Sequence, residues 1–295
     1  MEGGLLRTWF AKLVEALRFD RSASARTSAD VAANRLVERF EVVSDGLKIR
    51  GQIFYPVLRP ARMYPTLVIC HGIPGGADPP PADDPGYEGL AEEFSSLGIV
   101  CVIFNFRGCG DSEGNFDIIG WTRDLEMVVD QVLNTPHVDP TRLAVLGFSA
   151  GGAAAIMVGA ESSDVYALAV AGTPAHFGIL ARDAREVVED FRSRGIIRDP
   201  DFPRDLDRWM EGFSKIEPRR WIRHFKGNDL LIIHGDEDEL IPVEQARELF
   251  EAAPAGLAKL SVIPGGQHQL RKDPRCIEET KSWILSVLGW RDRQE

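Results

Sequence analysis

Short apolar runs alternate with amphipathic stretches over most of this chain. Continuous runs of Val, Ile and Leu are typical of buried strands, whereas apolar positions that recur every three or four residues predict helices. The first two strand-like runs, residues 38–43 and 47–55, flank Asp45-Gly46. Both turn residues tolerate a positive φ, so this dipeptide favours a tight hairpin. We therefore predict an N-terminal antiparallel hairpin.

Downstream of the hairpin, predicted strands and helices follow one another regularly. The predicted strands are residues 66–70, 99–104, 143–147, 166–171, 230–234 and 260–263, and the predicted helices are residues 87–97, 118–133, 151–159, 243–252 and 274–288. Strands that are apolar throughout and separated by helices indicate a mostly parallel sheet with helices on both faces. We predict one α/β core formed by residues 36–172 and 228–295.

Residues 173–227 interrupt this alternation. They separate two strands by far more chain than the dozen or so residues that a crossover requires. The segment is rich in charged residues but also contains aromatic ones, among them Phe177, Trp209 and Phe213. We predict a small helical cap over the core, whose aromatic residues line a substrate pocket.

The N-terminal segment, residues 1–35, also lies outside the alternation of strands and helices. Over the first twenty positions, apolar residues recur at helical spacing: Leu6, Phe10, Leu13 and Leu17. The polar stretch of residues 20–30 that follows is expected to be a linker. We expect this amphipathic helix to pack on its own domain or on a second copy of the chain in a homodimer.

Composition narrows the class of protein. The chain has 34 Lys and Arg against 45 Asp and Glu, a net charge of −11, and it lacks the clustered cations that nucleic-acid binding requires. No apolar run approaches the roughly 20 residues of a membrane-spanning helix, and the N-terminus has no secretory pattern. The four cysteines lie far apart, with no zinc or nucleotide motif. We expect a cytoplasmic protein with reduced cysteines and no cofactor.

The pattern Gly-x-Ser-x-Gly occurs twice, around Ser112 and around Ser149. Ser149 follows a predicted strand without a gap and leads directly into a helix of small residues. Such a strand–Ser–helix turn exposes the hydroxyl at the carboxyl edge of a sheet, where ligands of α/β proteins bind. The segment around Ser112 is separated from its strand, and no helix begins directly after it. We therefore select Ser149 as the nucleophile and interpret Ser112 as part of a loop that lines the cleft.

A serine hydroxyl needs a base within reach. His268 lies in a Gly-rich loop between the last predicted strand and the last helix, so it can reach the same edge. His71 and His234 end predicted strands, and we interpret both as structural caps. The acid that orients the base must then come from the turn after residues 230–234. Spacing alone leaves four candidates there: Asp236, Glu237, Asp238 and Glu239.

Five motifs together resemble those of α/β-hydrolases, in the branch of dienelactone hydrolases, feruloyl esterases and prolyl-oligopeptidase-like enzymes. They are His71-Gly72-Ile73-Pro74-Gly75, Phe106-Arg107-Gly108-Cys109-Gly110-Asp111-Ser112, Gly147-Phe148-Ser149-Ala150-Gly151, His234-Gly235-Asp236-Glu237-Asp238-Glu239-Leu240-Ile241-Pro242 and Gly265-Gly266-Gln267-His268. The order Ser, acid, His is also that of the family. The resemblance implies the α/β-hydrolase fold, and it assigns the acid to Asp238, four positions after the His of the His-Gly pair.

An oxyanion formed by attack of Ser149 needs preorganised N–H donors. Ala150, the residue after the nucleophile, is expected to supply one, and the resemblance implies that Ile73 supplies the other. Phe148 joins Phe177, Trp209 and Phe213 as expected pocket residues.

The sequence therefore predicts a serine hydrolase that cleaves small carboxylic esters. A serine peptidase, an acyl-aminoacyl hydrolase or a thioesterase uses the same residues and stays an alternative. A non-catalytic binding module on this fold is a remote alternative, because all three residues of a triad are present.

Overall fold

The computed structural model describes residues 36–60, 62–75, 84–178 and 183–289. The amphipathic helix predicted within residues 1–35, and the homodimer contact proposed for it, lie outside this range. Within the described residues, no helix combines the length and the apolar character needed to cross a membrane.

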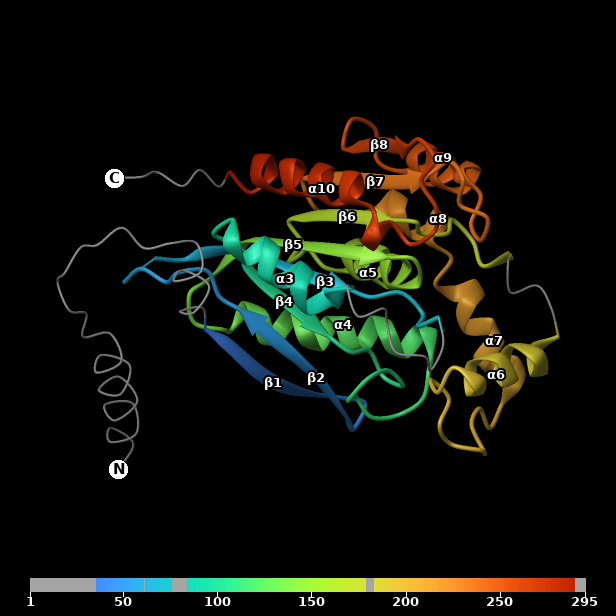
Figure 1. Ribbon diagram of the computed structural model, residues 1–295. Helices are drawn as coiled ribbons and strands as arrows, with labels where there is room; N and C mark the ends of the chain where they lie inside the picture. The colour runs from blue at the N-terminus through green and yellow to red at the C-terminus, as the bar shows by residue number, and fades with distance from the viewer. Residues whose placement is uncertain (1–35, 61, 76–83, 179–182, 290–295) are drawn as a thin grey trace, which may run out of the picture. The chain divides into compact units, whose positions relative to one another are not determined.

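Eight strands form one sheet (Figure 1) in the order β1-β2-β4-β3-β5-β6-β7-β8. The strands are β1 (Val37–Ser44), β2 (Leu47–Phe54), β3 (Tyr64–Cys70), β4 (Val100–Phe104), β5 (Val138–Phe148), β6 (Ala167–Ala171), β7 (Asp229–Gly235) and β8 (Ala258–Ile263). The hairpin β1–β2 is antiparallel, as is the pairing of β2 with β4, and all other neighbours are parallel. The predicted α/β-hydrolase fold, with its N-terminal antiparallel hairpin, is confirmed.

Helices cover both faces of the sheet (Figure 1). Helices α3 (Gly86–Ser96) and α10 (Pro274–Val287) pack on one face, and α4 (Ile118–Leu133), α5 (Ala150–Glu161) and α9 (Val243–Ala252) pack on the other. Successive side chains of a strand point to opposite faces, so β3 contributes Leu67 and Ile69 to one apolar cluster and Val68 and Cys70 to the other. Both faces of the central strands are thus buried against apolar side chains.

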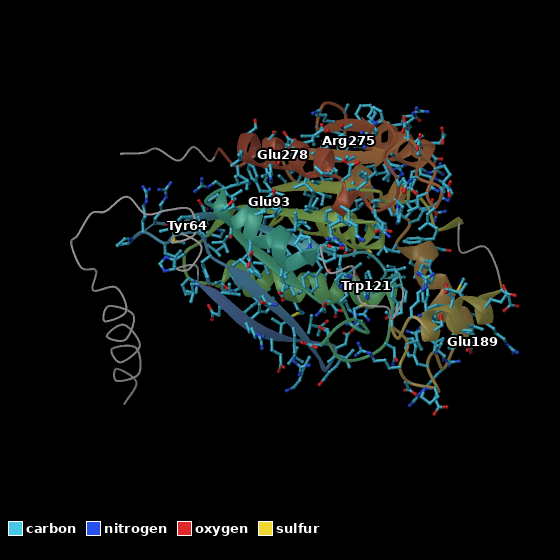
Figure 2. The ribbon with its side chains drawn as sticks, in the orientation of Figure 1. Tyr64, Glu93, Trp121, Glu189, Arg275 and Glu278 are labelled. Atoms are coloured by element: carbon cyan, nitrogen blue, oxygen red, sulfur yellow. The ribbon has the colours of Figure 1, made fainter. Side chains whose placement is uncertain are left out.

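Single side chains show how the helical layers are attached. On one face, Glu93 of α3 and Glu278 of α10 (Figure 2) both pair with Lys281. On the other face, Trp121 of α4 is fully buried and stacks on Phe106, with ring centroids 4.3 Å apart. An ion-pair cluster thus links α3 to α10 on one face, and aromatic packing attaches α4 on the other.

The cap predicted between β6 and β7 is helical. It contains α6 (Ala184–Ser193), α7 (Leu206–Lys215), α8 (Pro218–Trp221) and a 3₁₀ turn, η2 (Ile222–His224). Trp209 and Phe213 of α7 pack edge to face at 5.4 Å, and Phe116 of the core contacts both. The Trp209 indole also donates a hydrogen bond to the Phe116 carbonyl at 3.0 Å. An aromatic cluster therefore joins the cap to the core.

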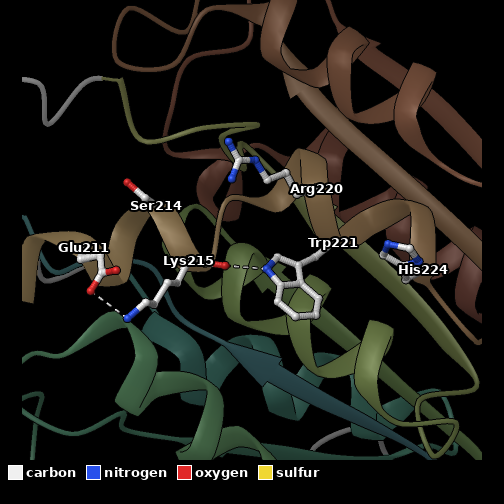
Figure 3. A pocket seen from close by; sticks show the side chains of 6 residues that line it. All are labelled: Glu211, Ser214, Lys215, Arg220, Trp221 and His224. Atoms are coloured by element: carbon white, nitrogen blue, oxygen red, sulfur yellow. Dashed lines mark hydrogen bonds and ion pairs between the residues drawn. The ribbon is translucent and has the colours of Figure 1, made fainter. Parts of the chain in front are cut away.

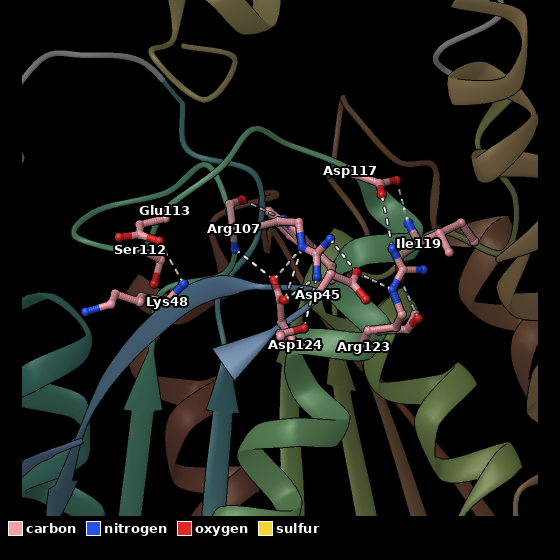
Figure 4. A network of polar contacts seen from close by, with 12 residues as sticks. Asp45, Lys48, Arg107, Ser112, Glu113, Asp117, Ile119, Arg123 and Asp124 are labelled. Carbon is pink, nitrogen blue, oxygen red and sulfur yellow. Dashed lines mark hydrogen bonds and ion pairs between the residues drawn. The ribbon is translucent and has the colours of Figure 1, made fainter. Parts of the chain in front are cut away.

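A buried arginine ties the first hairpin to the centre of the fold (Figure 4). Arg107 follows β4, and its guanidinium donates to Asp124 of α4 at 2.7 Å and to Asp45 in the hairpin turn at 2.9 Å. The side chain of Arg107 is 5% exposed and that of Asp124 is 0% exposed. Because the backbone N–H of Arg107 also donates to Asp124, the loop after β4 has a defined path toward the carboxyl edge.

Replacing Arg107 tests this network. Arg107→Met leaves the Asp124 carboxylate buried without its cation, so we expect the free energy of unfolding to fall by about 3–5 kcal/mol. Arg123→Met is the matched control: Arg123 also pairs with Asp45 but is 39% exposed, and its removal is expected to cost about 0–1 kcal/mol. Urea denaturation measures both variants. Equal, small losses would contradict a structural role for Arg107.

Candidate active site

Ser149 stands alone between β5 and α5, with φ 50° and ψ −125°. A positive φ costs a residue with a side chain about 1–3 kcal/mol, so the surroundings must hold this backbone in place. The Ser149 N–H donates to the Ala171 carbonyl of β6 at 2.9 Å, and the Ser149 carbonyl accepts from the Gly152 N–H at 2.9 Å. The adjacent strand and the first turn of α5 thus fix the strained residue from both sides.

Two glycines make this turn sterically possible. A side chain at Gly147 would collide with the backbone of Gly152, and one at Gly151 would collide with the carbonyl of His71. A helix that starts this close to two strand ends therefore requires residues without Cβ on both sides of Ser149. The Gly-x-Ser-x-Gly spacing is a consequence of that packing.

His268 lies in the loop after β8 and contacts both other predicted members of the triad. Its Nε2 is 3.2 Å from Ser149 Oγ, and its Nδ1 is 2.8 Å from Asp238 Oδ2. The His268 side chain is 24% exposed, whereas the Asp238 side chain is fully buried. The three groups form one continuous line from a buried carboxylate to a hydroxyl at the cavity surface.

The environment of Asp238 keeps its carboxylate charged. Burial by itself raises the pKa of Asp238, but hydrogen bonding from His234, His268 and the Ile241 N–H outweighs burial and lowers that pKa well below its usual range. Oδ1 accepts from the N–H groups of Leu240 and Ile241 at 3.0 and 2.8 Å. An ionised carboxylate here can fix the imidazole tautomer of His268 and stabilise its cation.

The structure separates the four carboxylates that spacing left open. Asp238 is the one in contact with His268. Asp236 is exposed, and its Oδ1 accepts from the Gly265 N–H at 2.6 Å. It therefore shapes the loop that carries His268 without touching the imidazole, while Glu237 and Glu239 are both surface residues in or beside the same turn.

The remaining motif residues occupy supporting positions. His71 accepts from the Phe106 N–H at 3.1 Å through Nε2, and its Nδ1 lies 2.7 Å from the Gly72 carbonyl. Burial lowers the pKa of His71, so the ring stays neutral between these partners. Ser112 is fully buried, donates to the Asn105 carbonyl and accepts from the Arg50 N–H at 2.9 Å. It does not border the cleft that its loop lines.

The two residues expected to supply oxyanion donors lie near Ser149. Ile73 and Ala150 both line the cavity beside it, and Ala150 is the first residue of α5, so its N–H has no partner within the helix. The loop that carries Ile73 passes so close that a Cβ on Gly72 would lie 3.0 Å from the Cβ of Ser149. Negative charge that develops at this point would also face the positive end of the helix dipole.

A cavity of about 1050 Å³ opens above these groups. Of the four predicted pocket residues, Phe148 and Phe177 line it. Trp209 and Phe213 do not: they lie in the aromatic cluster that joins the cap to the core. Further apolar wall is supplied by residues of the first loop, the cap and the acid turn: Pro74, Pro174, Phe191, Leu240 and Ile241.

Charged residues at the cavity wall were missed by sequence reasoning. Arg271 donates to both carboxylate oxygens of Asp84, at 2.8 and 2.6 Å, and its guanidinium lies 5.0 Å from the centroid of the Tyr87 ring. Hydrogen bonds from Arg271 lower the pKa of Asp84, against a smaller raising effect of burial. This clamp connects the start of α3 to η3 (Leu270–Lys272), directly after the His268 loop.

A separate hollow of about 450 Å³ lies in the cap (Figure 3) between α7 and α8. It is lined by Glu211, Ser214, Lys215, Arg220, Trp221 and His224, none of which borders the cavity above Ser149. Within the described ranges there is no cluster of three or more His, Cys, Asp or Glu side chains suited to a metal ion. All four cysteines are buried and unpaired.

Known proteins resemble this chain, some in sequence and others in fold. The chain is 27% identical over 238 residues to a monoacylglycerol lipase of Mycolicibacterium smegmatis, covering 68% of this chain and 84% of the lipase. Est1E of Butyrivibrio proteoclasticus, solved with ferulic acid bound, has a TM-score of 0.62 at 21% identity and covers 85% of this chain and 100% of its own. A puromycin-hydrolyzing peptidase of Mycobacterium tuberculosis has a TM-score of 0.63 at 19% identity, over 88% of this chain and 40% of the peptidase.

The family model "Prolyl oligopeptidase family" matches residues 88–291. That span contains Ser149, Asp238 and His268, as well as the whole cap and the last five strands of the sheet. This family consists of serine hydrolases. The matched span is well over half of the chain. The chain therefore belongs to the prolyl oligopeptidase family, as a hydrolase of the α/β-hydrolase fold.

Proposed function

We propose that this protein is a carboxylesterase in which Ser149, His268 and Asp238 form the catalytic triad. The observation that carries the proposal is the unbroken series of contacts among the three side chains, 3.2 Å from His268 Nε2 to Ser149 Oγ and 2.8 Å from His268 Nδ1 to Asp238 Oδ2. Both distances lie within or at the edge of hydrogen-bond reach, the geometry required of a nucleophile, a base and its orienting acid.

In the first half of the reaction, Ser149 Oγ attacks the ester carbonyl carbon while its proton moves to His268 Nε2. The carbonyl oxygen becomes an oxyanion, which the N–H groups of Ile73 and Ala150 stabilise. Collapse of this tetrahedral intermediate breaks the bond to the alkoxy oxygen, and His268 returns the proton to the departing alcohol. An acyl group then remains on Ser149.

In the second half, water enters the space left by the alcohol. His268 removes a proton from the water as its oxygen attacks the acyl carbon, and the same two N–H groups stabilise the second oxyanion. Expulsion of Ser149 Oγ, which takes the proton back from His268, releases the carboxylic acid. Asp238 remains ionised throughout and stabilises the imidazolium formed in each half.

The cavity walls favour an ester with an apolar acyl group. Ile73, Phe148 and Phe177 border the space next to Ser149, and Leu240 adds an exposed apolar side chain at its edge. The similarity to a monoacylglycerol lipase, whose substrate is an ester with an apolar acyl group, supports the same substrate class, and Est1E, solved with ferulic acid bound, has the same fold.

Peptidases in the family make amide hydrolysis the competing activity. An enzyme that recognises a free α-ammonium group needs an available carboxylate near the nucleophile. Both carboxylates that line the cavity in the described part of the chain are held by arginine: Asp84 by Arg271 and Asp190 by Arg194. This pairing argues for an uncharged ester over a peptide with a free N-terminus.

A p-nitrophenyl ester series from acetate to palmitate tests the proposal. Ser149→Ala is expected to lower kcat by about 10⁶-fold, because the nucleophile acts as a unit with its base. Ser112→Ala is the matched control, since it lies in the other Gly-x-Ser-x-Gly segment, and it should retain turnover. The matching p-nitroanilides, assayed in parallel, should react far more slowly. Faster cleavage of the anilides would favour the peptidase.

The two acidic residues of the turn after β7 distinguish the acid of the triad. Asp238→Asn is expected to reduce kcat by about 10⁴-fold, because an amide stabilises the wrong imidazole tautomer. Asp236→Asn should stay within a few-fold of the unmodified enzyme, since Asp236 contacts Gly265 and not His268. Steady-state kinetics on one ester measures kcat for both variants. Comparable losses of kcat in the two variants would refute the assignment of Asp238.

The lowered pKa of Asp238 predicts the pH dependence. A carboxylate whose folded-state pKa lies below the usual value of about 3.9 stays ionised above that pH, and its stabilising contribution is lost only as the pH falls through the lowered pKa. Between about pH 4.5 and 6, Asp238 should therefore stay ionised and add no slope of its own, so log kcat/KM should fall with a slope no steeper than one. A slope of two would indicate that Asp238 titrates in the same range.

A further inference from the structure

A second histidine contacts the acid of the proposed triad. His234, near the end of β7, is fully buried. Its Nε2 lies 2.8 Å from the Ile241 carbonyl oxygen and 3.3 Å from Asp238 Oδ2. His234 is not among the residues that line the cavity, so the substrate does not reach it.

The partners of His234 determine where its proton lies. The Ile241 carbonyl can only accept a hydrogen bond, so the hydrogen must be on Nε2. The Nε2–H group therefore lies between the Ile241 carbonyl and the Asp238 carboxylate. The other ring nitrogen, Nδ1, is buried without a hydrogen-bond partner among the described residues. All polar contacts of this side chain are thus directed at the turn that carries the acid.

His234 completes the set of donors around Asp238. Oδ1 accepts from two backbone N–H groups, those of Leu240 and Ile241, while Oδ2 faces the imidazole nitrogens of His268 and His234. A carboxylate offers about four lone-pair positions, and these four groups face them. The one hydrogen of His234 Nε2 is shared, with its shorter contact to the Ile241 carbonyl and its longer contact to Oδ2. Because Ile241 donates to Oδ1 and accepts from His234, the contacts form a closed ring that opposes rotation of the carboxylate plane.

We propose that His234 is a positioning residue for the reaction. It holds Asp238 Oδ2 in line with His268 Nδ1, and by sharing that oxygen it sets the strength of the Asp238–His268 hydrogen bond. A cap on the strand alone would satisfy the Ile241 carbonyl but would have no effect on the acid. The inference rests on the proposed function, since it requires Asp238 to be the acid of the triad.

Two substitutions of His234 separate positioning from simple support of the fold. His234→Met fills the space without an N–H group, whereas His234→Gln places an amide N–H near the position of Nε2. We expect His234→Met to lower kcat on a p-nitrophenyl ester by about 10- to 100-fold, with KM within about twofold of the unmodified value. His234→Gln should recover most of the loss.

Proton NMR supplies a readout independent of turnover. The hydrogen between His268 Nδ1 and Asp238 is expected to give a far-downfield signal. That signal should shift or broaden in His234→Met and return toward its original position in His234→Gln. The matched controls are His224→Met and His224→Gln, because His224 is exposed on the cap and takes no part in the triad. Neither control should change the signal or kcat.

The outcomes are distinguishable from a failure of the proposed function. If Asp238→Asn retains full activity, the acid is misassigned and the premise fails with it. If Asp238→Asn is inactive but folded His234→Met keeps the unmodified kcat and signal, only the role of His234 is overturned. Equal losses of kcat and melting temperature in His234→Met and His234→Gln would also overturn it. If His234→Met does not fold, His234→Asn, whose amide is too short to reach Oδ2, takes its place.

Discussion

The backbone of Ser149 is the constraint on which the rest of the site depends. Its positive φ is unfavourable for a residue with a side chain, and it persists because β6, the first turn of α5 and the glycines at 147 and 151 leave no alternative path. The same close packing brings the His71–Gly75 loop against the serine. The packing that exposes the hydroxyl therefore also places Ile73 and Ala150, which belong to two separate segments, beside it.

Parallel strands carry that constraint to the other members of the site. Asp238 follows β7 and His268 follows β8, and these neighbouring strands end at the same edge as β5. Loops alone would leave such side chains mobile, but here each has its own support. Asp236 shapes the His268 loop, the Asp84–Arg271 pair clamps the segment after it, and Arg107 holds the loop after β4. A buried aromatic cluster then sets the cap above them.

Much of this arrangement could be predicted from the sequence, and the failures have physical reasons. Apolar strand periodicity located the sheet, but it missed the start of β5, because residues 139–142 are not apolar and are at least partly exposed. The unbroken strand–Ser–helix pattern identified Ser149, whereas choosing Asp238 among four carboxylates required a family resemblance. Apolarity could not tell Trp209, which joins the cap to the core, from Phe177, which lines the cavity. Arg271 and its partners meet only after folding, so no local pattern reveals them.

The position of the cap in the chain has one more consequence. Because it lies between β6 and β7, it divides the polypeptide into a first part that holds Ser149, Ile73 and Ala150 and a second part that holds Asp238 and His268. During synthesis the serine turn therefore leaves the ribosome well before the two residues proposed to activate it. If the proposed triad is correct, a nascent or truncated chain has a serine without a base, and two fragments separated within the cap are inert until they associate.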